Sequence, residues 1–201
     1  LKLHSRLKGI VLQGAKQTRI HKLEDKEASV KIINYEGLQV IQKELIKYPF
    51  DCLVCDESQK IKGFRSIRTK ICITLSKNIK YRYLLSGTPV LNNPLDIFSQ
   101  FLCLDQGETF GSSYYGFRNK YFEDYNQKRR GTNFYFPDYK PKPGIVPLLN
   151  ELIMRKADRK TKEECLDLPD KVYQTIKIQM HKEQEKAYKE MKDMLITYFE
   201  E

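Results

Sequence analysis

Two short apolar runs, each stopping abruptly at a polar motif, constrain the fold of this chain more than any other feature. The first run, residues 50–55, ends at the letters DESQ, and the second, residues 83–85, ends at SGTP. Both runs are typical of buried parallel strands, and open sheets of such strands place their ligands at the carboxyl ends. The pattern therefore predicts a ligand site where these two strands end.

The adjacent carboxylates of Asp56 and Glu57, within DESQ, suit the hydrolysis of a magnesium-bound nucleotide. In such sites one acid holds Mg²⁺, usually through water, and the next orients the attacking water. An isolated Asp-Glu pair is common, and most such pairs are solvated loop acids. The ordered series of apolar strand, DESQ, helix-length gap, apolar strand and SGTP favours a nucleotide-binding sheet instead.

Strand and helix patterns alternate four times in the first half of the chain. This alternation predicts a parallel, doubly wound sheet. Strands are expected at residues 8–13 and 30–33 and directly before DESQ and SGTP. Helices are expected at residues 15–26, 38–48, 66–77 and 95–104.

The alternation ends after residue 105, and the second half predicts a different organisation. A helix is expected at residues 116–125, a loop at 126–144, a helix at 145–154 and a charged linker at 155–168. Residues 171–180 alternate as a strand does, and residues 182–201 predict a helix. The buried side of that last helix is expected to carry Ala187, Tyr188, Met191, Met194, Leu195 and Tyr198.

Composition narrows the class of protein. The chain has no stretch of 18 apolar residues and no signal-type start, which predicts a soluble, intracellular protein without a membrane partner. We expect a cytoplasmic or nucleoid location if it is bacterial or from a phage, and a nuclear one if it is eukaryotic. The first residue is Leu, which suggests a fragment of a larger protein.

The five cysteines include a single C-x-x-C and the histidines are scattered, so reduced thiols are favoured over a zinc site.

The charge is strongly basic and unevenly distributed. The formal net charge is +10, and residues 1–105 carry 18 basic and 10 acidic side chains. The densest basic run follows the acid pair and contains Lys60, Lys62, Arg65, Arg68 and Lys70. A solvated helix face is one interpretation of this run, but its position beside the acid pair favours contact with a polyanion.

Four segments in this order resemble the Swi/Snf-type DNA-dependent ATPases of helicase superfamily two. They read IINYEGL, LVCDESQKIKG, YLLSGTPVLNNPLDIF and MRKADR…LPDKVYQTIKIQM, within residues 8–180. The resemblance implies an α/β fold, a RecA-like parallel sheet flanked by helices, with a mainly helical protrusion and a C-terminal linker toward a second lobe. The implied domains are a partial ATPase lobe at residues 1–105, the protrusion at 106–157, and the linker with the start of the crossing at 158–201.

The resemblance also implies roles for individual residues. Asp56 would coordinate Mg²⁺ through water, and Glu57 would position the water that attacks ATP. The residues expected to couple hydrolysis to DNA are Gln59, Ser86, Gly87 and Thr88. Gln59 stands where the family usually has His and Ser86 where Thr is usual, and both replacements can form hydrogen bonds.

The expected partner is double-stranded DNA, with a protein partner or further lobes of the same polypeptide. The residues expected at the DNA are Asn34, Tyr35, Lys60, Lys62 and Arg65. The expected function is part of an ATP-driven translocase or remodeller, and the alternative is a non-catalytic DNA- or protein-binding scaffold. A strand-separating helicase has no wedge or pin signature to support it. The chain contains no G-x-x-x-x-G-K-[ST] phosphate loop, so by itself it is expected to be inactive.

Overall fold

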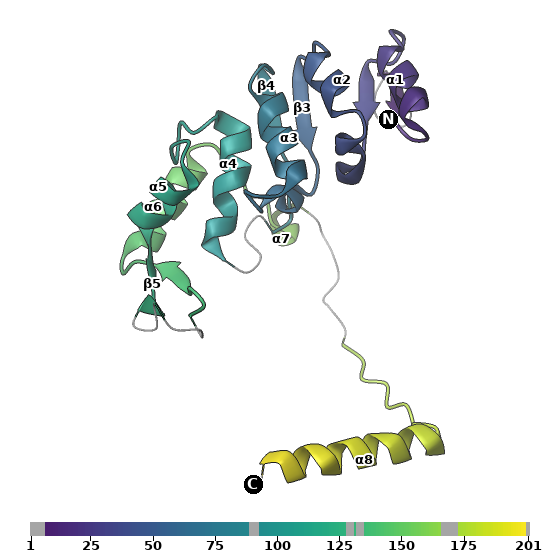
Figure 1. Ribbon diagram of the computed structural model, residues 1–201, viewed down its shortest axis with the longest axis vertical. Helices are drawn as coiled ribbons and strands as arrows, with labels where there is room; N and C mark the ends of the chain where they lie inside the picture. Colours follow the sequence, from purple (N-terminus) through teal and green to yellow (C-terminus); the bar gives the residue numbers. More distant parts are fainter. Residues whose placement is uncertain (1–6, 89–92, 128–130, 132–134, 166–172, 200–201) are drawn as a thin grey trace. The chain divides into compact units, whose positions relative to one another are not determined.

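The computed structural model describes residues 7–88, 93–127, 131, 135–165 and 173–199. The chain divides into two compact units, Leu1–Ala157 and Asp158–Glu201, and Figure 1 labels their elements. None of the helices in the described ranges is both long and apolar enough to cross a membrane.

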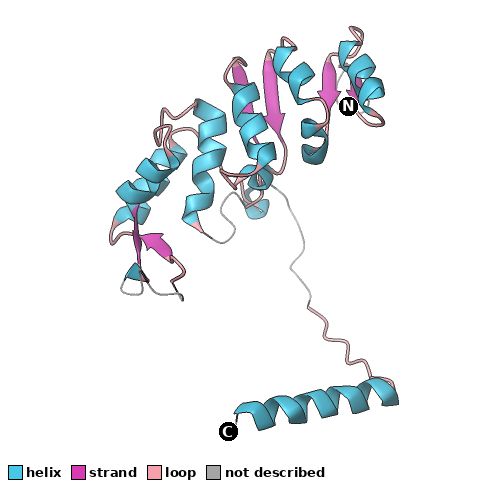
Figure 2. Cartoon of the chain, viewed as in Figure 1, coloured by secondary structure: helices cyan, strands magenta, loops and turns pink. Residues whose placement is uncertain are grey.

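The described strands of the first unit form three separate pairs, drawn in magenta in Figure 2. β1 (Gly9–Val11) and β2 (Val30–Ile32) run parallel, as do β3 (Cys52–Cys55) and β4 (Tyr81–Leu84). Each parallel pair is joined by a connection that contains helix, as parallel neighbours require. β5 (Phe122–Asp124) and β6 (Tyr139–Pro141) are antiparallel. The parallel strand pairing expected from the sequence is confirmed.

Helices account for most of the remaining described structure of the first unit. The elements before β4 are α1 (Lys16–Glu24), η1 (Tyr35–Gln39), α2 (Gln42–Lys47), η2 (Ser58–Ile61) and α3 (Ile67–Ser76). The elements after β4 are η3 (Pro94–Asp96), α4 (Ile97–Asp105), α5 (Tyr114–Tyr121) and α6 (Ile145–Met154). Side-chain caps fix several starts: Ser66 accepts from the Thr69 amide before α3, and Ser113 accepts from the Gly116 amide before α5.

A mainly aliphatic core, here called the strand cluster, holds the parallel pairs against α1 to α4. Its buried members are Leu12, Leu23, Leu38, Ile41, Leu45, Cys55, Ile61, Ile71, Cys72, Leu75, Ile79 and Cys103. Alternation along β3 and β4 turns Leu53, Cys55 and Leu84 toward this core. Val54 and Tyr83 point the other way and are each 55% exposed. Within the described residues, helices therefore pack on one face of these strands, whereas the doubly wound sheet expected from the sequence has helices on both.

A second core, here called the aromatic cluster, lies between α4, α5 and α6. Its buried members are Leu95, Ile97, Phe98, Phe101, Phe110, Phe117, Tyr121, Phe122 and Leu149. The rings meet edge-on or tilted, with centroids 5.2 Å apart for Phe98 and Phe117 and 4.9 Å apart for Phe110 and Phe117. Helix α4 belongs to both cores, because Cys103 faces the strand cluster while Phe98 and Phe101 face the aromatic cluster.

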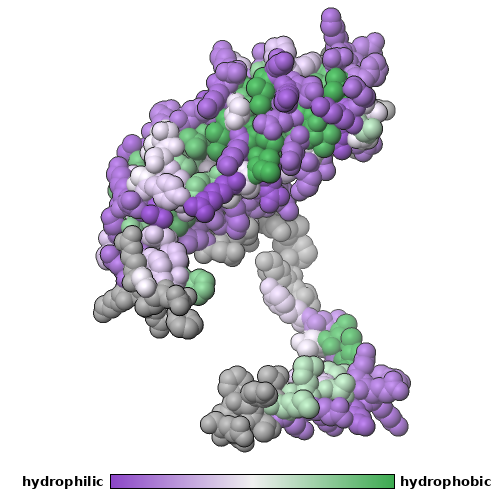
Figure 3. Space-filling model, in the orientation of Figure 1, coloured by the Kyte–Doolittle hydropathy of each residue, from purple (hydrophilic) through white to green (hydrophobic). Residues whose placement is uncertain are grey.

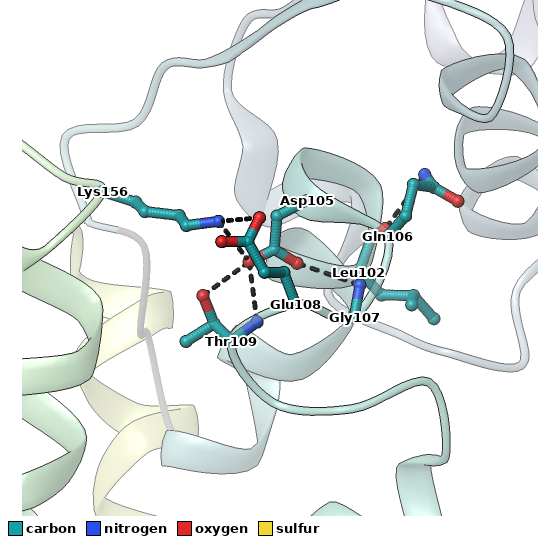
Figure 4. Close-up of polar contacts among 7 residues, drawn as sticks. All are labelled: Leu102, Asp105, Gln106, Gly107, Glu108, Thr109 and Lys156. Carbon is teal, nitrogen blue, oxygen red and sulfur yellow. Dashed lines mark hydrogen bonds and ion pairs between the residues drawn. The ribbon is translucent and has the colours of Figure 1, made fainter.

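The end of α4 is fixed by a compact polar turn, shown in Figure 4. The Asp105 carboxylate accepts hydrogen bonds from the Gly107 and Thr109 amides, each at 3.0 Å. Lys156, just beyond α6, pairs with Asp105 at 3.4 Å and Glu108 at 2.6 Å. Gly107 has a φ of +94°, and a Cβ there would lie 2.8 Å from a backbone carbon. The turn therefore requires glycine, and Lys156 joins the ends of α4 and α6.

One prediction for the second half of the first unit is wrong. The helix expected at residues 116–125 ends at Tyr121, and Phe122–Asp124 instead form β5. The partner strand, β6, lies inside the segment expected to be a loop. Pairing with a distant strand overrides the local helical preference here.

The second unit, Asp158–Glu201, contains α7 (Lys162–Cys165) and α8 (Lys182–Phe199). The strand expected at residues 171–180 is wrong for the described part, because residues 173–180 form neither helix nor strand. Ile178 is 86% exposed, and no described strand pairs with this segment. Within this unit the burial expected for α8 is not found at Ala187, Tyr188, Met191 and Met194, which are exposed. Leu195 and Tyr198 lie outside the residues whose side chains the structure describes. Figure 3 shows hydrophobic side chains at the surface of this unit, so no described element of the unit itself covers its apolar stripe.

Candidate functional site

The carboxyl ends of β3 and β4 bring the DESQ and SGTP motifs side by side. Cys55 lies opposite Leu84 in the parallel register. Beyond the strands, the Leu85 amide donates to the Cys55 carbonyl at 2.9 Å and the Ser58 amide donates to the Leu85 carbonyl at 2.8 Å. The two motifs therefore occupy one edge of the strand pair, where parallel sheets place their ligands.

The acid pair is open to solvent and its backbone is unusual. Asp56 and Glu57 are both exposed, and Glu57 has a left-handed backbone with a φ of +51°. Non-glycine residues rarely adopt that region, and the surrounding contacts must hold them there. The Glu57 amide donates to Asp56 Oδ1 at 3.0 Å, and the Tyr35 hydroxyl donates to the Asp56 carbonyl at 2.7 Å.

A chain of hydrogen bonds joins the SGTP loop to the second acid. The Ser86 hydroxyl donates to Gln59 Oε1 at 2.8 Å, and Gln59 Nε2 donates to Glu57 Oε2. The Thr88 amide in turn donates to the Ser86 hydroxyl at 3.2 Å. Because an amide side chain carries both a donor and an acceptor, Gln59 can serve both neighbours at once. Gly87 lies between Ser86 and Thr88 and is exposed.

Asn34 and Tyr35 have local partners beside this edge. The Asn34 carboxamide accepts from the Gly37 amide at 3.1 Å and caps η1. Burial raises the pKa of the half-buried Tyr35 hydroxyl, with Cys55 contributing, so the hydroxyl stays protonated and donates to Asp56. Contact of either residue with DNA stays a prediction.

The three basic residues predicted at the DNA have different surroundings. Lys62 pairs with Asp96 at 3.1 Å, and both side chains are largely covered. Arg65 donates to the Tyr115 hydroxyl at 2.8 Å and lies over the Phe64 ring. The exposed Lys60 side chain forms no hydrogen bond or ion pair to the part of the chain that the structure describes. Of the three, Lys60 has the amine most available to an external anion.

Comparison with known proteins identifies the family. The SNF2-related domain family matches residues 2–199, nearly the whole chain. The chain belongs to the SNF2-related domain family. This confirms the family resemblance inferred from the four ordered sequence segments.

Individual relatives of this SNF2-related domain are much longer than the chain. The p41 protein of Acyrthosiphon pisum secondary endosymbiont phage 1 is 32% identical over 128 residues, 59% of this chain and 28% of the phage protein. The SWI/SNF-related matrix-associated actin-dependent regulator of chromatin subfamily A-like protein 1 of Bos taurus is 33% identical over 92 residues, 43% of this chain and 10% of the bovine protein. The Sulfolobus solfataricus SWI2/SNF2 ATPase core in complex with dsDNA is 26% identical, with a TM-score of 0.49, and the match covers 58% of this chain and 23% of that one. The chain thus spans less than a third of each relative's length.

The acids of this SNF2-related domain fit a magnesium ion that is shared with a nucleotide. No three His, Cys, Asp or Glu side chains in the described ranges are grouped to hold a metal by themselves. Mg²⁺ in nucleotide sites needs only one or two carboxylates, because water and phosphate oxygens complete its coordination. The exposed Asp56 carboxylate can supply such a ligand, since only one of its oxygens accepts the Glu57 amide.

Two buried polar residues of the SNF2-related domain were missed by the sequence analysis. Ser58 and Gln100 are each 2% exposed, and the Ser58 hydroxyl donates to Gln100 Oε1 at 2.7 Å. Gln100 is flanked by the apolar residues of α4 that form the aromatic cluster, including Ile97 and Phe101. A glutamine on the buried face of an apolar helix is a signal that sequence inspection could have used, because buried polar groups need partners.

Proposed function

We propose that this chain is the part of an ATP-dependent double-stranded DNA translocase or remodeller that carries the hydrolytic acids. The supporting observation is the hydrogen-bond chain from Ser86 through Gln59 to Glu57. A shift of the SGTP loop is transmitted through these hydrogen bonds to the carboxylate that faces the nucleotide. A structural scaffold has no need for such a connection between two exposed motifs.

In the proposed reaction the two acids have separate tasks. Asp56 would hold Mg²⁺ through water, and the bound ion would neutralise charge on the ATP phosphates. Glu57 orients the attacking water, and its orientation is set by the amide of Gln59. ATP binds between this unit and a second lobe of the same polypeptide, so the chain alone does not turn over ATP.

The proposed DNA path runs beside the acid pair on the side of the basic run. Lys60 neutralises a backbone phosphate, because its amine is exposed and makes no contact within the described residues. Phosphate contacts position the duplex without reading its sequence. Asn34, Tyr35, Lys62 and Arg65 remain candidates whose own side chains are partly engaged within the protein.

ATP hydrolysis by the intact polypeptide, measured with and without duplex DNA, tests the proposal. We expect turnover that DNA stimulates and that Asp56→Ala abolishes. We expect residues 1–201 alone to show no turnover, because their sequence contains no phosphate-binding loop. An intact protein that binds duplex DNA but hydrolyses no ATP would establish the scaffold instead.

A further inference from the structure

The left-handed backbone of Glu57 is held from two sides. On the side that precedes it, the Tyr35 hydroxyl donates to the Asp56 carbonyl. On the side that follows it, the Ser58 amide donates to the Leu85 carbonyl at 2.8 Å. Positive φ at a bulky residue persists only where its neighbours fix it. The position of the Glu57 carboxylate therefore depends on how firmly Ser58 is held.

The Ser58 side chain is held by Gln100 of α4, 42 residues further along the chain. Its hydroxyl donates to Gln100 Oε1 at 2.7 Å, and Gln100 Nε2 donates to the Asp96 carbonyl at 3.1 Å. Ser58 and Gln100 are each only 2% exposed, so water does not compete for this hydrogen bond. A buried polar pair of this kind fixes one arrangement, since any other leaves a hydroxyl or an amide without a partner.

We infer that Gln100 is a positioning residue for ATP hydrolysis, which acts through Ser58 to hold the backbone of Glu57 in its left-handed conformation. The inference rests on the proposed function. Gln100 does not touch the nucleotide: through Ser58 it holds the backbone from which the Glu57 side chain extends, while Gln59 orients the carboxylate itself. Displacement of a reacting group by about 1 Å costs on the order of 10²-fold in rate, so a remote hydrogen bond can control turnover.

Two variants of the intact polypeptide test this role. Gln100→Met keeps the length and volume of the side chain but loses both hydrogen bonds, and Ser58→Ala removes the hydroxyl from the other end. We expect each to lower kcat by about tenfold or more while the Kd for ATP stays within about twofold. The kcat of the double variant is expected to lie within about twofold of the kcat of the less active single variant, because both changes break the same connection.

The matched control is Ser99→Ala. Ser99 is the neighbour of Gln100 on α4, is fully buried, and its hydroxyl has no hydrogen-bond partner in the described residues. We expect it to leave kcat within about twofold of wild type, with an unfolding midpoint no lower than that of wild type. If Gln100→Met fails to fold, Ser58→Ala decides the question, because it removes a single oxygen atom.

The possible results separate this inference from the proposed function. If the wild type is active and Ser58→Ala has a normal kcat, the inference is overturned and the proposed function stands. The same holds if the two single losses in kcat multiply in the double variant. A raised KM with unchanged kcat also overturns it, because positioning of the water-orienting acid acts on turnover. A wild-type polypeptide without ATP turnover overturns the proposed function and this inference with it.

Discussion

The strand cluster and the aromatic cluster lie in the same compact unit but differ in composition and in what their edges carry. The strand cluster is built from Leu, Ile and Cys side chains, and DESQ and SGTP emerge from the ends of its strands. The aromatic cluster contains six buried Phe and Tyr rings and none of the hydrolytic or coupling residues predicted from the sequence.

The difference follows from the backbone. Parallel strands end with amides and carbonyls that have no further strand partner, and Leu85, Cys55 and Ser58 show how neighbouring segments satisfy them. Polar side chains gather at such ends, whereas rings between helices bury large areas without exposing the backbone. The aromatic cluster contributes indirectly, because it fixes α4, and α4 presents Gln100 to Ser58 of the DESQ motif. Asp96, at the end of η3 directly before α4, pairs with Lys62 of the basic run.

The largest expected effect tests whether the hydrolytic chemistry belongs to the edge of the strand cluster and not to the aromatic cluster. Glu57→Gln in the intact polypeptide should lower ATP turnover by about 10²–10⁴-fold, the usual contribution of a general base, and leave nucleotide binding in place. Steady-state hydrolysis with duplex DNA measures this. The matched control is Glu123→Gln on β5, an exposed acid beside the aromatic cluster, which should not change turnover. Turnover of Glu57→Gln within threefold of wild type would contradict the assignment.

The next effect tests whether the clusters are energetically separate. Phe98→Ala in the 201-residue chain should lower the free energy of unfolding by about 3–5 kcal/mol, because it leaves a cavity among the rings. Since α4 belongs to both cores, we expect the loss to reach the strand cluster. Denaturant unfolding gives the energy, and hydrogen exchange at Ile71 in α3 reports its extent. Faster exchange confined to residues 95–149 would show that the two clusters unfold independently.

A smaller effect compares one helix cap from each region. Ser66→Ala and Ser113→Ala should each lower the free energy of unfolding by about 1 kcal/mol, within a range of about 0.5–2. Ser66→Ala should lower the free energy of unfolding more, because the Ser66 hydroxyl also forms a hydrogen bond with the buried Thr69 hydroxyl at 2.7 Å. Within the described residues, the Ser113 hydroxyl accepts only from the Gly116 amide, at 3.2 Å. Equal losses measured by denaturant unfolding would mean that the Thr69 contact adds nothing.

The smallest expected effect concerns two lysines of the basic run that follows the acid pair. Lys60→Ala should flatten the log–log salt dependence of duplex binding by about one unit, alike for different DNA sequences. Lys62→Ala should leave that slope nearly unchanged and lower the unfolding midpoint, because Lys62 already pairs with Asp96. Fluorescence anisotropy at several salt concentrations measures both. A flattened slope for Lys62→Ala alone would place the phosphate contact at the paired lysine.

The sequence alone determined the parts of this protein that depend on local patterns. The bounds predicted for α6 match the structure, and α3 begins after Ser66 as its pattern indicates. The parallel pairing of β3 and β4 followed from two apolar runs separated by a helix-length gap. Each of these features depends on periodicity or capping within about a dozen residues, which a single segment encodes.

Only the tertiary structure decided which distant groups meet. The antiparallel pair of β5 and β6 replaced an expected helix end, and Ser58 found its partner in Gln100, 42 residues away. The stripe of α8 has the spacing of a buried helix face, yet Tyr188 and Met191 are exposed. Periodicity specifies that a face is apolar, but burial and hydrogen bonding depend on a second surface, and that surface comes from another part of the fold.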